Sequence, residues 1–353
     1  MQDSDVVLSL PRPVEGVRRK GVRWKAVTLL VTSVVVFYLV LGPLFIALIA
    51  TFREKDTLPL EAGPFTFVNY ARVFLDPATW TLMVNTLVFA GGSLIIGMGL
   101  AIVFSWLIER SDLPYHELMF SLIIAPMAMP GMMAAIAWIF LLDPRIGLIN
   151  LILRGTLGLD IMKGPLNIYT LWGMIFVEGI RMVPTIFLMI SGAFRSMDPS
   201  LEEASRVAGK SNWVTTIRIT LPLMWPAIMA ALLYYLIVAM EVFEVPGVLG
   251  LNAGIHVFST RIYWAVNPSI GGLPDYGLAS TLGLLLIAIS LVLIWFYYRA
   301  TKKTYRFVTV TGKGFRPQRV RLGRWKYAAR LLCAFYFAVA LALPLFILLW
   351  TSL

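Results

Sequence analysis

Four charged side chains stand inside long apolar runs of the sequence. Glu178 and Arg181 lie three residues apart, so they share a helix face and could pair. Glu241 and Glu244 have the same spacing and carry the same charge. Charges in such surroundings usually neutralise one another or line a polar passage, here one suited to a cation. Neutralisation is the favoured interpretation of Glu178 and Arg181, whereas both interpretations stay open for the two glutamates.

Residue types that would support catalysis or metal binding are sparse. Cys333 is the only cysteine, and His116 and His256 lie far apart, so no disulfide and no cysteine or histidine metal cluster is expected. Gly209-Lys210-Ser211 looks like the end of a phosphate-binding loop, but Ala204 stands where that loop needs its first glycine. The sequence therefore predicts no catalytic residue and no metal site in this chain.

A polar stretch, Ser196–Pro222, separates two of the apolar runs and begins like a soluble helix. Asp198 suits an N-cap, and Pro199 suits the first helical position, where its missing N–H has no cost. Glu202 and Glu203 fall in the first turn, where the helix dipole favours acids. The pattern predicts a short helix that begins near residue 199.

The rest of this stretch predicts a break and a second short helix. Gly209 is a natural left-handed stop, and Ser211 can cap a helix that carries Trp213 and Ile217. Small residues at such a bend let another protein backbone approach closely. A connector lying on the membrane surface would instead be expected to carry more basic residues. Docking of a partner protein is favoured, and a surface connector is the alternative.

Membrane-spanning helices are the elements that must position these residues. The chain is 59% hydrophobic and 14% charged, whereas soluble domains have about 45–50% and about 25%. A helix needs about 20 apolar residues to cross a bilayer, and the first such run is too long for a signal-peptide core. Internal prolines (Pro43, Pro126, Pro130, Pro184) are tolerated when neighbouring helices satisfy the freed backbone groups. Seven stretches qualify as spans: 26–50, 83–107, 118–142, 168–193, 223–249, 276–298 and 328–350.

The basic residues predict how the spans are oriented. Of 30 Lys and Arg, alternate segments hold 22 on one side and 7 on the other, with Arg181 inside a span. The positive-inside rule then places the N-terminus and the stretch Ser196–Pro222 in the cytoplasm. The basic run Arg299–Arg330 is cytoplasmic too, and we interpret it as a linker at anionic lipid headgroups and not as a nucleic-acid site.

Part of the sequence is repeated. Arg23-Trp24-Lys25 matches Arg324-Trp325-Lys326, and Pro43–Ile46 matches Pro344–Ile347, both at an offset of 301 residues. Tandem duplication is the favoured interpretation, and coincidence in an apolar chain is the alternative. Duplication predicts four parts: a basic tail (1–25), a six-span unit (26–300) with the hairpin at 196–222, a basic linker (301–327), and the first span of a second, truncated unit (328–353).

The hairpin contains Glu203-Ala204-Ser205, then Gly209, Ile219 and Leu221-Pro222. This pattern resembles the cytoplasmic signature of permease subunits of binding-protein-dependent ABC importers: Glu-Ala-Ala, three residues, Gly, nine residues, Ile, one residue, Leu-Pro. Every spacing is kept, and Ser205 in place of alanine is the one departure. The stretches 85–87 and 243–250 also look like this family, so the resemblance covers about residues 26–300.

The resemblance implies an all-α integral membrane fold: a MetI-like six-helix permease unit followed by the first helix of a second, incomplete unit. Fused two-half iron(III) and thiamine permeases are built in this way. It also implies a second permease half, separate ABC ATPase subunits that hydrolyse ATP, and a periplasmic or lipid-anchored solute-binding protein. The chain itself would bind no cofactor, would not be an enzyme, and would be a multi-pass protein of the bacterial inner membrane. The positions that would couple it to the ATPase are Glu202, Glu203, Ala204, Ser205, Gly209, Ile219, Leu221 and Pro222.

The transported solute is less closely defined by the sequence. Carboxylates within the spans suit a hard cation such as iron(III), and a polyamine would use acids equally well. Iron(III) is therefore the first expectation, followed by polyamine or thiamine. The alternative function is an ATP-independent secondary transporter or channel, which would have spans and buried charges but no need for the hairpin signature.

Overall fold

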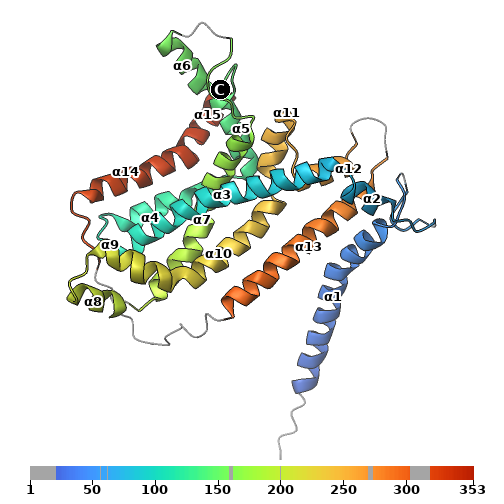
Figure 1. Ribbon diagram of the computed structural model, residues 1–353, viewed down its shortest axis with the longest axis horizontal. Coiled ribbons are helices and arrows are strands. Elements are labelled where there is room, and N and C mark those ends of the chain that lie inside the picture. Colours follow the sequence, from blue (N-terminus) through green and yellow to red (C-terminus); the bar gives the residue numbers. More distant parts are fainter. Residues whose placement is uncertain are drawn as a thin grey trace, which may run out of the picture.

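The computed structural model describes residues 21–55, 57–61, 63–158, 162–198, 200–268, 273–302 and 319–353, which form helices without a β-strand (Figure 1). The N-terminal tail to residue 20, Pro199 and most of the basic linker lie outside these residues. The larger helices are α1 (Gly21–Ala50), α3 (Pro77–Arg110), α4 (His116–Ile124), α5 (Gly131–Leu142), α6 (Leu148–Leu157), α7 (Leu171–Ser196), α10 (Leu221–Glu241), α12 (Phe258–Val266), α13 (Tyr276–Thr301), α14 (Trp325–Phe337) and α15 (Leu343–Ser352). The shorter ones are α2 (Val68–Phe74), α8 (Ser200–Val207), α9 (Asn212–Thr215) and α11 (Leu251–Ala253), with a 3-10 turn at Ala125–Ala128 and π-helical turns at Thr216–Thr220, Pro246–Gly250 and Ala338–Ala342.

Six of the described helical segments are long and apolar enough to cross a membrane: Trp24–Ala50, Pro77–Arg110, Leu171–Ser196, Asn212–Ala253, Tyr276–Arg299 and Trp325–Ser352. They correspond to six of the seven predicted stretches. Pro43 and Pro184 lie inside α1 and α7 without ending either helix. The prediction of an all-α membrane fold is confirmed.

The third predicted span, 118–142, is not one helix. It consists of His116–Ala128 and Gly131–Leu142, which meet at an angle of 94°. Met129, which precedes Pro130, is extended (φ −90°, ψ 120°). A residue before proline is driven out of the helical region because the proline ring clashes with its backbone. From the sequence, a helix was expected to tolerate Pro130. The chain instead turns there, so the expectation of a continuous span is wrong.

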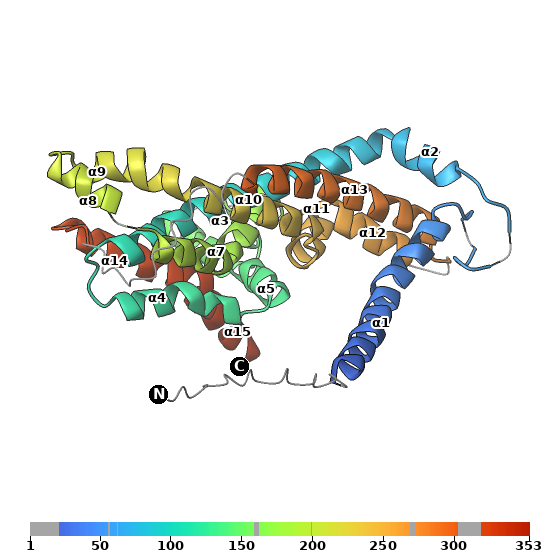
Figure 2. The same ribbon diagram turned by 90° about the horizontal axis from the view of Figure 1, so that it is seen from below.

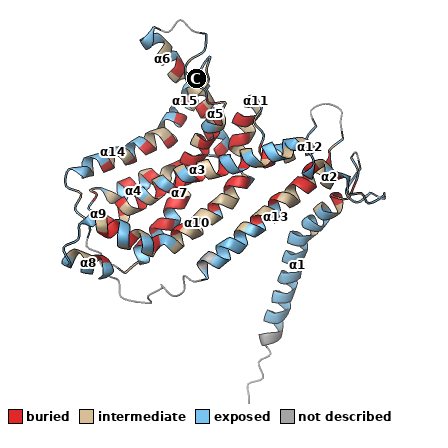
Figure 3. Cartoon of the chain, viewed as in Figure 1, coloured by how far each residue is buried: buried red, intermediate tan, exposed pale blue. Residues whose placement is uncertain are grey.

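The centre of the bundle is the close pair α3 and α7, and α7 is buried along much of its length (Figure 3). A Cβ added at Gly97 would lie 3.1 Å from the carbonyl oxygen of Gly179, and one added at Gly179 would lie 2.8 Å from the Cβ of Ile96. Small residues at such contacts let two membrane helices approach closely. The same pair carries Arg110, Glu178 and Arg181, so its packing fixes their positions.

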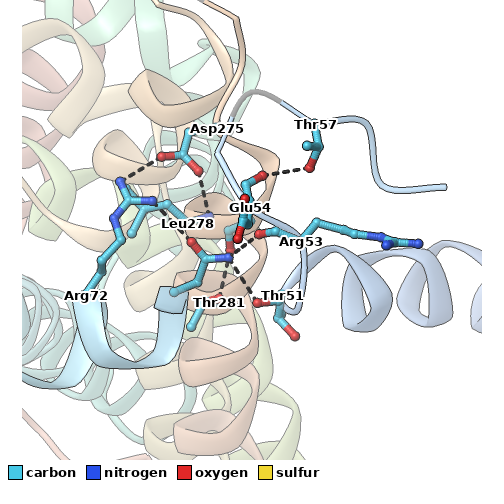
Figure 4. Close-up of polar contacts among 10 residues, drawn as sticks. Thr51, Arg53, Glu54, Thr57, Arg72, Asp275, Leu278 and Thr281 are labelled. Atoms are coloured by element: carbon cyan, nitrogen blue, oxygen red, sulfur yellow. Dashed lines mark hydrogen bonds and ion pairs between the residues drawn. The ribbon is translucent and has the colours of Figure 1, made fainter. Parts of the chain in front are cut away.

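Helix α1 diverges from the rest of the bundle (Figures 1 and 2). In its most apolar window 6% of the residues are buried, against 72% in that of α7. It contacts α13, and a group of polar residues at its end joins it to α2 and α13 (Figure 4). We call this group, Thr51, Arg53, Asn69, Arg72 and Asp275, the collar. The buried Asn69 amide donates to the carbonyls of Thr51 (3.0 Å) and Arg53 (2.6 Å). Arg72 donates to Asp275 at 2.8 Å, which joins α2 to the start of α13.

The repeat-related helix α14–α15 is better covered. Cys333 is fully buried, the ring of Tyr336 lies 5.1 Å from that of Phe104, and the Tyr336 hydroxyl donates to the carbonyl of Ile180 at 3.2 Å. These contacts seat α14 against α3 and α7, and α15 packs on α5. The two copies of the repeat therefore have different surroundings in the described part of the chain.

A polar turn connects α5 to α7 at the end of the bundle opposite the hairpin. The Asp143 carboxylate accepts hydrogen bonds from the backbone of Arg145 (2.7 Å) and Ile146 (3.0 Å) and from the Tyr169 hydroxyl (2.9 Å). Partial burial works to raise the pKa of Asp143, but these donors outweigh it and hold the pKa below its usual range. Burial, with the bond to this carboxylate, raises the pKa of Tyr169 to about 12.

Candidate functional site

The polar stretch forms the hairpin that its sequence predicts. Asp198 accepts a hydrogen bond from the backbone N–H of Ser200 at 2.9 Å, at the start of α8. Gly209 follows α8 with φ of 76°, a left-handed conformation that glycine adopts without strain. Ser211 caps α9 by accepting from the N–H of Val214 at 3.3 Å. The predicted helical position of Pro199 lies outside the described residues.

The second helix of the hairpin is not a separate element. From Asn212 the chain runs through the π turn Thr216–Thr220 directly into α10. The N–H of Leu221 donates to the carbonyl of Thr216, five residues earlier. A proline in the first turn of a helical segment is tolerated, and the wider turn absorbs the change in hydrogen bonding before Pro222. The hairpin is therefore continuous with a span.

The two adjacent acids of α8 point in different directions. Glu202 is 5% exposed, and its carboxylate accepts a hydrogen bond from the Thr220 hydroxyl at 2.6 Å. Glu203 is half-buried and has no ion pair within the described residues. Large apolar side chains project from the same hairpin: Leu201, Val207 and Trp213 are 53%, 90% and 71% exposed. The hairpin thus has one acid turned inward and an apolar surface turned outward.

The other predicted coupling positions lie at the bend or at the start of α10. The Ser205 hydroxyl and the Thr215 hydroxyl are 2.8 Å apart and bond across the hairpin, so the departure from alanine is accommodated by a polar contact. Ala204 and Gly209 are exposed, and a Cβ added at Gly209 would meet open space. Ile219 and Leu221 are half-buried and Pro222 is exposed.

The partners of Glu202, the acid that is turned inward, were not predicted from the sequence. Arg110, the last residue of α3, is 3% exposed and lies 3.7 Å from Glu202. Beside it, the Trp106 indole donates to the Thr216 hydroxyl at 3.2 Å. An arginine at the end of an apolar run ordinarily extends to the membrane surface. Nothing in the linear pattern therefore marked Arg110 as buried.

The charged residues within the spans form a cluster of three. The Glu178 carboxylate is fully buried and accepts two hydrogen bonds from the Arg181 guanidinium, at 2.9 and 2.7 Å. Arg181 also lies 3.4 Å from Glu244, whose side chain is 46% exposed. The predicted pair of Glu178 and Arg181 is confirmed. Two carboxylates around one guanidinium leave the cluster with a net negative charge.

Glu241 does not join this cluster. Helix α10 ends at Glu241, and Val242 is extended (φ −58°, ψ 128°). Pro246 has no N–H with which to bond the carbonyl of Val242, and the Ser259 hydroxyl donates to that carbonyl instead, at 2.7 Å. The expectation that Glu241 and Glu244 share one helix face is therefore wrong, and Glu241 is exposed.

A cavity of about 220 Å³ opens beside the cluster. Glu178 and Arg181 line it together with the aromatic residues Tyr234 and Tyr235 and with Met127, next to the break between α4 and α5. The carboxylate of Glu244 lies against Gly131, the first residue of α5. The broken helix thus lies beside a cavity that two charged side chains line, with Glu244 next to it, as expected where non-helical backbone lines a polar cavity.

A larger cavity, of about 740 Å³, lies at the end of the bundle opposite the hairpin. Arg72, Asn85, His256 and Arg261 line it, and Asn85 donates to the carbonyl of His256 at 3.2 Å. In the part of the chain that the structure describes, no three His, Cys, Asp or Glu side chains come together in a way that could hold a metal ion. His256 is thus part of this wall, whereas His116 opens α4, and neither belongs to such a cluster among the described residues.

Comparison with known proteins places these features in a family. Residues 93–305 match the family model described as "Binding-protein-dependent transport system inner membrane component". The chain is 25% identical to a Haemophilus influenzae protein named as a ferric transport system permease, FbpB 1, over 84% of this chain and 44% of that protein. The chain thus spans less than half of that relative's length.

Two further similarities cover nearly the whole of the matched protein. The spermidine/putrescine transport system permease protein PotB of Haemophilus influenzae is 25% identical over 81% of this chain and 97% of its own. A chain in the crystal structure of a bacterial alginate ABC transporter bound to its periplasmic protein aligns with a TM-score of 0.63 and 21% identity, over 82% of this chain and 96% of that one. Together with the family match, which covers more than half of the sequence, these findings show that the chain belongs to the inner membrane permease components of binding-protein-dependent transport systems.

Proposed function

We propose that this chain is the membrane-spanning subunit of an ATP-driven importer. It would move a solute inward by alternating access, together with separate ABC ATPase subunits and an extracytoplasmic binding protein. The family match supports the general role. The chain would bind no cofactor itself, because the partner subunit hydrolyses ATP. Its hairpin end would face the cytoplasm, as the distribution of basic residues indicates.

The exposed apolar surface of the hairpin is the observation that supports this proposal most directly. Leu201, Val207 and Trp213 are held outward by a well-capped bend, and Glu203 lies between them in sequence. A large aromatic residue with apolar neighbours is typical of the centre of a protein interface. We infer that the ATPase covers this surface and that Glu203 meets a basic or amide group on it.

Co-purification of the ATPase with the membrane subunit tests this docking. We expect Glu203→Lys to reduce the ATPase recovered with the solubilised chain by at least tenfold. Glu117→Lys is the control, since Glu117 is an exposed acid in the first turn of α4, after the short turn that follows α3. Equal recovery with both variants would refute the docking role of Glu203. Full solute uptake in vesicles without any ATPase would instead favour a secondary transporter or channel.

The bend at Gly209 supplies a second test. Gly209→Val should lower transport because a branched residue at φ of 76° is strained. Gly209→Asn is the control, because asparagine tolerates the left-handed region better than other residues. Transport by the valine variant at the wild-type rate would show that the bend is not needed for coupling.

The charged cluster and its cavity are our candidate for part of the translocation path. Glu178, Arg181 and Glu244 carry a net negative charge beside the space that Tyr234 lines. We propose a cationic solute, with iron(III) first and polyamine or thiamine next. Relatives named for ferric ions and for spermidine and putrescine support these choices. Glu241 is a secondary candidate, because it is exposed at the last residue of α10 and does not contact the cluster.

The solute is best identified on the binding protein encoded beside this gene. Mass spectrometry and metal analysis of that protein, isolated from the periplasm, should detect iron(III). A bound polyamine, thiamine or sugar would overturn the iron assignment while leaving the importer proposal in place.

A complete importer pathway would need a second permease half, fused or separate. We propose that residues 26–300 form one half and that α14–α15 begins the next, because α1 and α14–α15 carry the two copies of the repeat. Sequencing the reading frame around this gene would test the fused arrangement. A second hairpin signature about 300 residues after the first is expected from the offset between the repeats.

A further inference from the structure

The end of α3 is tied to the end of α7 by one buried side chain. Arg110 closes α3 and is 3% exposed. Its guanidinium donates to the carbonyls of Phe194 (3.0 Å) and Met197 (3.2 Å), where α7 ends. Carbonyls at a helix end lack intrahelical donors. Arg110 therefore supplies hydrogen bonds to the end of α7 in addition to the long one (3.4 Å) that the Met197 N–H donates to the Phe194 carbonyl.

The same guanidinium faces the hairpin. Its Nε lies 3.7 Å from Oε1 of Glu202, close enough for an ion pair but too far for a hydrogen bond. Among the described residues this buried Nε has no hydrogen-bond acceptor. The Thr220 hydroxyl donates to the same Glu202 oxygen, which ties α8 to the π turn before α10. Both charges of the pair are withdrawn from water, with side-chain exposures of 3% and 7%.

The backbone of Arg110 holds a third segment. The N–H of Val320 donates to the carbonyl of Arg110 at 2.8 Å, and the N–H of Asp112 donates to the carbonyl of Val320 at 3.0 Å. The Asp112 carboxylate also accepts from the N–H of Leu322 at 2.7 Å. Residues 319–322, which lead into α14, thus form a parallel bridge with the chain that follows α3. One small cavity is bordered by Arg110, Glu202 and Val320 together.

We propose that Arg110 is the positioning residue through which movement of the hairpin reaches α3, α7 and α14. This inference rests on the proposed function, because it assumes that an ATPase moves the hairpin. Separating a buried ion pair leaves uncompensated charge, so the pair resists opening. Displacement of α8 is therefore passed to Arg110, and from Arg110 to every element that its side chain and backbone hold.

A neighbouring ion pair provides a matched control. Arg195 near the end of α7 donates to Glu109 of α3 at 2.7 Å, so it joins the same two helices one residue away from Arg110. The Arg195 side chain is 66% exposed, and its ion pair and hydrogen bonds within the described residues are with Glu109 and not with the hairpin. Loss of this pair should therefore leave the link to α8 intact.

The test uses the complete importer in proteoliposomes, with the loaded binding protein as isolated from the periplasm. The measured quantity is the ratio of ATP hydrolysis with and without that binding protein. We expect Arg110→Gln to lower this ratio at least fivefold and Arg195→Gln to leave it within a factor of two. Arg110→Lys should recover part of the ratio, because it keeps the charge but not the planar set of donors. A purely structural role would reduce the amount of assembled complex and leave the ratio unchanged.

If the arginine variants fail to assemble, Glu202→Gln provides a second variant in which the hydrolysis ratio can be measured. It removes the charge opposite Arg110 but still accepts from Thr220, and it should lower the ratio at least threefold. An unchanged ratio in Glu202→Gln or Arg110→Gln would overturn the inference. Failure of the wild-type chain to bind any ATPase would instead overturn the proposed function.

The link to α14 can be tested separately with Ser111→Cys and Val320→Cys, in a chain whose Cys333 is replaced by alanine. These two residues face each other across the parallel bridge. If the segment before α14 moves together with α3, a disulfide between them should leave the hydrolysis ratio unchanged. A loss of stimulation on oxidation that dithiothreitol reverses would show that the two segments must separate, against the inference.

Discussion

Glu178 and Glu202 are both buried carboxylates opposite an arginine, yet they are held in different ways. Glu178 sits in the middle of α7, and its partner Arg181 comes from the same helix and donates two short hydrogen bonds. Glu202 sits on the hairpin, and its partner Arg110 comes from another helix at 3.7 Å. The first pair lies within one helix, with Glu244 3.4 Å from its arginine, whereas the second is long-range and its arginine is shared with the end of α7.

The first arrangement neutralises a charge within one helix, whereas the second connects separate elements of the fold. A pair within one helix moves as a unit, so it can keep a charge inside a span without fixing any other element. A pair between elements constrains their relative position. We therefore expect the two sites to respond differently when one partner, or both, are removed.

Arg181→Met should have the largest effect on stability. It leaves Glu178 buried without a counter-ion, which costs about 3–5 kcal/mol. Replacing both residues, as Glu178→Met with Arg181→Met, should recover most of that loss because no charge remains buried. Thermal unfolding of the detergent-solubilised chain measures both. A double variant as unstable as the single one would mean that the pair is not a self-contained unit.

Arg110→Met should cost somewhat less, about 3 kcal/mol, because Thr220 still donates to Glu202. Here the double variant with Glu202→Met should recover little. The carbonyls of Phe194 and Met197 would still have lost the hydrogen bonds from the guanidinium. Full recovery in the same unfolding assay would contradict the shared role of Arg110 and make the two sites alike.

Glu244→Gln should have a small effect, below about 1 kcal/mol, since partly exposed ion pairs contribute little. Its carboxylate is 46% exposed and lies 3.4 Å from an arginine already paired with Glu178. A melting temperature within about 2 °C of wild type is expected for a loss of this size. A loss as large as that of Arg181→Met would mean that Glu244 is an integral part of the Glu178 and Arg181 pair.

Asp143→Asn should have the smallest effect on stability, about 0.5 kcal/mol at neutral pH. It provides a comparison with a polar turn outside the spans. The pKa of Asp143 is lowered in the fold, so its stabilisation is present above the ordinary aspartate pKa and is lost as pH falls through the lowered value. The difference in melting temperature between wild type and variant should be constant above about pH 5 and should shrink below about pH 4. A difference that grows in acid would mean that the fold raises the pKa of Asp143 and does not lower it.

The local features were accessible from the sequence because they depend on neighbours in the chain. Asp198, Gly209 and Ser211 fixed the hairpin through caps and a positive φ, and Glu178 with Arg181 paired through helix spacing. Apolar length alone located six spans. These are interactions over a few residues, for which sequence spacing and distance in space agree.

The features that sequence reasoning missed depend on where distant segments meet. In the sequence, Arg110 is one basic residue among the loops. In the structure, α7 and the hairpin surround it. The end of α10 at Glu241 depends on which backbone groups find a substitute donor. For Val242 that donor is Ser259, seventeen residues along the chain. A linear pattern does not contain this information.

The collar at the end of α1 has a mechanical consequence. Asn69 and Arg53 hold one end of a helix that is 30 residues long, or about 45 Å at 1.5 Å per residue, while the other end projects away from the bundle (Figure 2). Such a helix acts as a lever with its pivot at the collar. A tilt of about 10° would carry the Trp24 end through about 8 Å, given that length. A fluorescent or spin label near Trp24 would therefore magnify rearrangements that are small at Asn69.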